Sequence, residues 1–113
     1  MTKDTSTIIT RPTDPEKLRF LSQKLEEYTR RIAREEHRHP DLWGDTALDA
    51  WHKRTVLETL LTTGVVDSWQ LSEEMFKRSP EMINPELFDR AVNVIIDYCE
   101  TGGKNTHREH VLS

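Results

Sequence analysis

Apolar side chains recur along residues 14–37 at alternating spacings of three and four, and charged residues fill most of the remaining positions. Such a narrow apolar stripe predicts an amphipathic helix that packs on one neighbour. The helix is expected to begin near Pro15 and to end before Pro40, because proline suits a first helical turn and disfavours the helical conformation in the residue before it. The short repeat favours packing within the chain over a coiled coil formed with a partner.

The central stretch, residues 47–75, predicts two helices joined by a short turn. Its first half places alanines, leucines and Trp51 at helical spacing, with Asp45 as a plausible N-cap and Gly64 as the stop. The second half carries another tryptophan, Trp69. Because a tryptophan buries a large apolar area, we expect this helical hairpin to form the centre of the core.

The last helix is predicted over residues 85–101 and has the widest apolar surface of the chain. Asn84, Pro85 and Glu86 supply a cap, a first-turn proline and a first-turn acid in the favoured order, and Gly102 provides a stop. A helix with so wide an apolar surface is either central or is pressed against a partner on a second side.

These patterns predict an all-α protein, a single small bundle of about four helices with flexible termini. Residues 1–12 are expected to form a flexible arm or an arm that orders against a partner, and residues 102–113 a polar tail. No strand is expected. The helical domain would span residues 13–101, with helices over about residues 14–37, 46–63, 68–78 and 85–101.

Composition narrows the function classes. The chain of 113 residues has a net charge of -4, which argues against a general nucleic-acid binder. Residues 46–78 also fit a helix-turn-helix, but Glu73 and Glu74 occupy the half of the second helix that should meet base edges. No apolar run has the length of a signal peptide or membrane span, and a single cysteine excludes an internal disulfide, so we expect a cytoplasmic protein.

Candidate chemistry in the sequence is sparse. The histidines form one His-x-His and one His-x-x-His, but no acidic or cysteine ligand is clearly placed to complete a metal site, so solvated surface histidines are the preferred interpretation. The pairs are His37 with His39 and His107 with His110. Cys99 is expected to be a buried structural thiol. Phosphate-loop, nucleophile-elbow and metalloprotease motifs are missing, so we predict no catalytic, cofactor-binding or metal-binding residue in this chain.

A tryptophan-led helix, a Gly-Val turn and a short acidic helix follow one another from Trp51 through Gly64 and Val65 to Met75. This order resembles the helical N-terminal part of nitrile hydratase β subunits, of the split-β or small-subunit type, over about a quarter of the chain. The catalytic α subunit of that family holds cobalt or iron in a cysteine cluster. This chain has one cysteine and lacks the β-barrel of a usual β subunit.

The resemblance implies a noncatalytic helical subunit of a hetero-oligomeric nitrile hydratase-like enzyme, which hydrates nitriles to amides. The chain would clamp the metal-bearing catalytic subunit, with Trp51, His52 and Arg54 near the interface; cobalt or iron would belong to that partner. His52 is expected at the helix surface or interface rather than as a catalytic base. The alternative is a small helical protein–protein interaction adaptor or regulator without an enzymatic role, which binds through the helix of residues 14–37 or that of residues 85–101.

Overall fold

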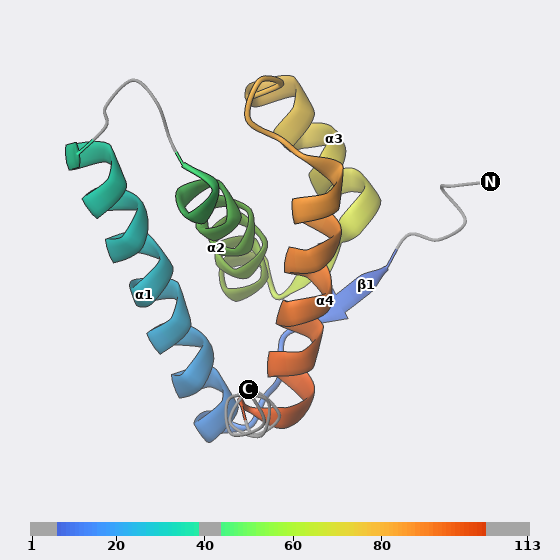
Figure 1. Ribbon diagram of the computed structural model, residues 1–113. Coiled ribbons are helices and arrows are strands. Elements are labelled where there is room, and N and C mark those ends of the chain that lie inside the picture. Colours follow the sequence, from blue (N-terminus) through green and yellow to red (C-terminus); the bar gives the residue numbers. More distant parts are fainter. Residues whose placement is uncertain (1–6, 39–43, 104–113) are drawn as a thin grey trace.

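Four helices and two short strands make up the part of the chain that the computed structural model describes, residues 7–38 and 44–103 (Figure 1). The prediction of a small all-α bundle is confirmed, and each predicted helix boundary lies within a residue or so of the observed one. The elements in chain order are β1 (Ile8–Thr10), α1 (Pro15–Arg38), α2 (Asp45–Thr63), β2 (Val65–Asp67), α3 (Ser68–Arg78) and α4 (Pro85–Thr101).

The strands β1 and β2 pair antiparallel, with Ile9 opposite Val66. Both of these side chains are buried, at 3% and 1% exposure, because they face the core on one side of this two-stranded sheet. The backbone N–H of Arg11 also donates to the carbonyl of Gly64 at 2.9 Å. The expectation of a flexible arm is therefore wrong for residues 7–11, and the expectation of no strand is wrong as well; residues 1–6 lie outside the described part.

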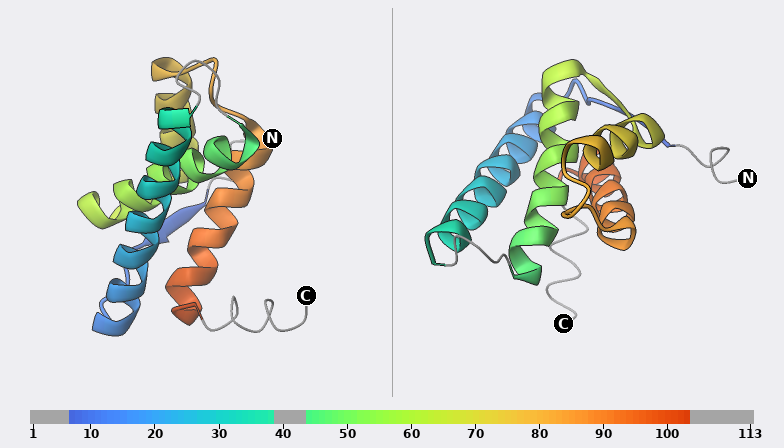
Figure 2. Two further views of the ribbon diagram at one scale, coloured as in Figure 1. Left: turned by 60° about the vertical axis from the view of Figure 1, so that its left-hand side comes forward. Right: turned by 90° about the horizontal axis from the view of Figure 1, so that it is seen from above.

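Helix α2 lies at the centre of the bundle and packs against both α1 and α4. Figure 1 and the right-hand view of Figure 2 show α2 between α1 and α4, and these two outer helices approach each other at one end. The core side chains that are fully buried come from all three helices. They include Leu21, Val56, Leu57, Leu60 and Ile95. The prediction that the α2 segment is central is thus confirmed.

The helix ends follow the sequence signals closely. Asn84 caps α4, since its side-chain oxygen accepts from the N–H groups of Glu86 and Leu87 at 2.9 and 3.1 Å. Gly64 ends α2 in the left-handed conformation with φ of 89°, which glycine adopts without a steric cost. One expectation is wrong: α2 begins at Asp45 and Gly44 is its cap, so Asp45 is the first helical residue rather than the cap.

Helix α3 lies at the edge of the fold, and Met75 is its buried residue. Trp69 is 41% exposed and Phe76 is 60% exposed. The expectation that both tryptophans lie at the centre of the core is therefore wrong for Trp69, whereas Trp51 is partly buried and packs against the core. Within residues 7–38 and 44–103, no helix is long and apolar enough to cross a membrane.

Candidate functional site

An apolar groove is lined by residues of α3, of the first half of α4 and of the connection between them. Figure 1 shows these two helices next to each other, on the side of the fold away from α1. We call this hollow the α3–α4 groove, and it encloses about 680 Å³. Its apolar lining comes from both helices and from the connection between them. These side chains are Trp69, Phe76, Pro80, Ile83, Pro85, Phe88 and Val92.

Helical periodicity places these side chains in the groove. Trp69 and Phe76 are seven residues apart and so lie on one face of α3, two turns from each other. Phe88 and Val92 are four residues apart on α4 and form the floor, since each is 6% exposed. The groove is therefore flanked by exposed aromatic side chains on α3 and closed underneath by core residues of α4.

The rim of the groove carries charges of both signs. Glu73 and Lys77 stand on the α3 side, and Asp89 stands on the α4 side. Ser72 and Asn93 add uncharged polar groups. An apolar centre with a polar rim is the usual anatomy of a protein-binding surface.

The three residues that sequence reasoning placed at an interface do not meet in one surface patch. His52 is 0% exposed, so the expectation that it lies at the surface or at an interface is wrong. The Trp51 ring stands edge-on to the His52 ring, with the ring centres 4.9 Å apart. Arg54 instead reaches α1, where its Nε donates to the hydroxyl of Thr29 at 3.1 Å.

Both ring nitrogens of the buried His52 have backbone partners. Nδ1 lies 2.7 Å from the carbonyl oxygen of Leu48, and the backbone N–H of Asn84 points to Nε2 at 3.0 Å. Burial lowers the pKa of His52, and the Leu48 carbonyl and the Asp49 carboxylate offset this only in part. Leu48 lies one turn before His52, which is a local signal, but nothing in the sequence points to Asn84 as the second partner.

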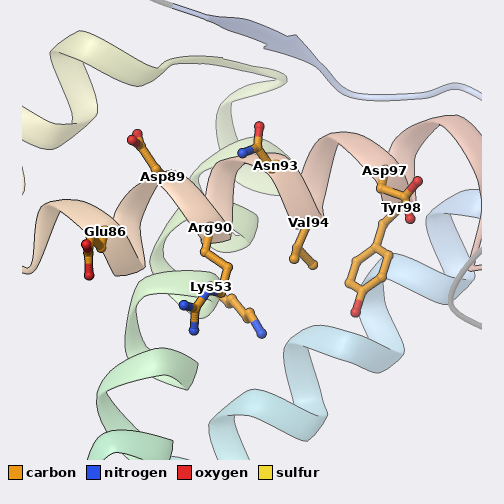
Figure 3. Close-up of a pocket in the computed structure, with 8 residues that line it drawn as sticks. All are labelled: Lys53, Glu86, Asp89, Arg90, Asn93, Val94, Asp97 and Tyr98. Atoms are coloured by element: carbon orange, nitrogen blue, oxygen red, sulfur yellow. The ribbon is translucent and has the colours of Figure 1, made fainter. Parts of the chain in front are cut away.

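A second, polar hollow of about 780 Å³ borders an adjacent side of α4 (Figure 3) and shares Asp89 and Asn93 with the α3–α4 groove. Lys53 of α2 and Arg90 of α4 approach each other there, and Tyr98 points toward α1. Three acids also line the hollow, Glu86, Asp89 and Asp97. The charges are mixed and Lys53 is paired with Asp49 at 2.8 Å, so the hollow shows no clear preference for an anion or a cation.

Tyr98, which lines this hollow, contacts Tyr28 of α1. The hydroxyl oxygens of Tyr28 and Tyr98 are 3.4 Å apart, and Lys24 Nζ lies 5.5 and 5.6 Å from the two ring centres. Burial raises the pKa of Tyr28, and its contact with Tyr98 adds to the rise. The Tyr28 phenol therefore stays protonated, and its contact with Tyr98 joins α1 to α4.

Metal and thiol chemistry find little support in the described residues. Residues 7–38 and 44–103 contain no group of three His, Cys, Asp or Glu side chains that could hold a metal ion. The side chain of His37, and the whole of His39, His107 and His110, lie outside the described part. Burial raises the pKa of the Cys99 thiol, and Glu100 raises it further, which disfavours the nucleophilic thiolate.

Comparisons of the chain with protein-family models, with curated proteins and with solved structures find no match. The resemblance to nitrile hydratase β subunits consequently rests on the sequence pattern between Trp51 and Met75. Among the described residues, the α3–α4 groove is the feature that most resembles a binding surface, because it has an apolar centre and a polar rim.

Proposed function

We propose that this chain is a noncatalytic helical subunit that binds another protein in the α3–α4 groove. The observation that carries the proposal is the exposure of two large aromatic side chains, Trp69 at 41% and Phe76 at 60%, along one wall of the groove. Tryptophan is enriched among residues that dominate binding energy, and phenylalanine is enriched in interface cores. Exposed large apolar groups that cluster at a hollow mark interaction sites more often than scattered ones do.

An amphipathic helix of the partner protein fits the groove best. The lining spans two turns of α3, from Trp69 to Phe76, which corresponds to about 10 Å of helix length. A partner helix laid along it would insert apolar side chains at spacings of three, four and seven. Glu73 and Asp89, on opposite rims, would favour basic residues beside that apolar stripe.

The sequence resemblance proposes an identity for the partner. In that version the chain is part of a cytoplasmic hetero-oligomer, a nitrile hydratase-like enzyme, and the partner is the catalytic subunit that binds cobalt or iron through cysteines. The groove fits an adaptor or regulator equally well, because its chemistry recognises a helix and not a metal site. The subunit and adaptor alternatives differ in whether the partner protein binds a metal.

The native mass of the endogenous complex, with its subunits and bound metal identified, tests the proposal. We expect a complex that contains a cysteine-rich cobalt or iron protein and that is lost in the double variant Trp69→Ala/Phe76→Ala. Val65→Ala is the matched control, since Val65 is apolar and 49% exposed but lies outside the groove lining. A partner protein that binds no metal and is lost in the groove variant would favour the adaptor alternative. If the chain is a monomer at physiological concentration, both alternatives are contradicted.

A further inference from the structure

We propose that His52 is an acid-sensitive latch: its neutral ring holds the connection between α3 and α4 in place, and protonation of Nε2 releases that connection. The latch is a property of the fold, and its regulatory meaning rests on the proposed function, because the released segment is one end of the α3–α4 groove. The geometry around the two ring nitrogens carries the inference.

The hydrogen bonds of His52 fix its tautomer. A carbonyl oxygen only accepts, so the 2.7 Å contact with Leu48 requires a hydrogen on Nδ1. A backbone N–H only donates, so the 3.0 Å contact from Asn84 requires a lone pair on Nε2. A second proton would go to Nε2 and face the Asn84 hydrogen. Protonation therefore turns this hydrogen bond into a clash between two donors.

Asn84 links the latch to the groove. Its neighbours in sequence, Ile83 and Pro85, both line the groove, and its side chain caps α4. The turn before it is closed by the N–H of Ile83, which donates to Ser79 at 3.2 Å. When the Asn84 N–H loses its acceptor, this end of the groove loses its hydrogen bond to α2 and is held there by the packing of Ile83 against the core.

The charges around His52 set the direction of its pH response. Asp49, one turn away on α2 itself, favours the protonated ring, but burial opposes protonation more strongly. Of the described residues, no charged group on α1, α3 or α4 contributes to the shift, and the α3–α4 connection presents the Asn84 amide. The pKa of His52 is thus below its usual value of about 6.5.

The sign follows from linkage. The unfolded chain binds a proton at His52 more readily than the folded chain, so the contribution of His52 to stability is complete above about pH 6.5. It is lost as the pH falls from that value toward the lower folded pKa. The latch is expected to release as the pH falls through the lowered pKa that His52 has in the folded chain.

A pH titration of the wild-type full chain by nuclear magnetic resonance tests the latch without a partner or a variant. At neutral pH the ring nitrogen shifts should show the Nδ1–H tautomer. On acidification, the Asn84 amide and the His52 ring should titrate with one midpoint below 6.5, the usual pKa. Protection of the Asn84 amide from hydrogen exchange, corrected for the intrinsic rate, should fall about tenfold, as expected for one lost hydrogen bond.

The Gln70 amide is the matched internal control. It also lies at the start of a helix, but it donates to the carboxylate of the N-cap residue Asp67 at 3.2 Å instead of to a histidine. It should keep its protection through the His52 midpoint. An Nε2–H tautomer at neutral pH, protonation of His52 without a change at Asn84, or simultaneous loss of both amides would each overturn the latch. Loss of partner binding in the groove variants is a separate outcome, so failure of the proposed function is distinguishable.

Discussion

Helices α2 and α3 follow one another in the chain and each carries a tryptophan in its first half, yet the two side chains have different environments. Trp51 packs against the core and stands edge-on to the buried His52 ring. Trp69 is 41% exposed and borders the α3–α4 groove. If the proposed function holds, stability depends mainly on α2 and partner binding mainly on α3, so substitutions should separate the two properties.

The difference arises from how each helix is covered. Helix α2 has neighbours on both sides, α1 and α4, and so it buries residues around much of its circumference. Helix α3 has 11 residues and is positioned by β2 and by its Asp67 cap, with Met75 as its buried anchor. Leu71 also packs against the core, but so short a helix leaves Trp69 and Phe76 exposed.

The largest expected effect is on α2. Leu57 is 0% exposed, so Leu57→Ala leaves a cavity between α2 and its neighbours and should lower the free energy of unfolding by about 2–5 kcal/mol. Denaturant unfolding followed by circular dichroism measures this change. Leu57→Met keeps most of the volume and should cost less than about 1.5 kcal/mol. Equal losses for the two variants would show that the α2 core does not depend on close packing.

The junction between the two helices should show an intermediate effect. Gly64 has φ of 89°, and an alanine there should lower the free energy of unfolding by about 1–2 kcal/mol, because its Cβ disfavours the left-handed conformation. Thermal unfolding measures the loss. Gly64→Asn is the control, since asparagine tolerates this conformation better. If Gly64→Ala and Gly64→Asn unfold at the same temperature, backbone strain is not what sets the direction of the chain from α2 into β2 and α3.

Sequence reasoning reached the features that depend on neighbouring residues. Helical spacing predicted the four helices, and single residues such as Gly64 and Asn84 predicted their ends, because capping and left-handed turns are local. It missed the strand pair because β1 has three residues, too few for a visible alternation, and its partner Val66 lies far along the chain from Ile9. Long-range pairing of this kind leaves no periodic signal.

The candidate site was harder to predict for the same reason. The order of apolar residues shows that α3 has an apolar face, but not whether the rest of the chain covers it. The expectation for Trp69 therefore followed the general tendency of tryptophan to be buried, and the fold leaves it 41% exposed. His52 shows the converse: the sequence favoured a surface or interface position, yet the side chain is buried and its Nε2 accepts from the N–H of Asn84, 32 residues away.

The smallest expected effect on stability, and the sharpest test of the comparison, is at Phe76. This side chain is 60% exposed, so Phe76→Ala should change the free energy of unfolding by less than about 0.5 kcal/mol. The same substitution should weaken partner binding at least about tenfold, because it removes a large apolar contact from the groove wall. Denaturant unfolding and titration calorimetry with the identified partner, run on the same preparation, measure both. Val65→Ala should change neither. If Phe76→Ala instead destabilises the fold and leaves binding intact, α3 is a structural helix like α2 and the partner binds elsewhere.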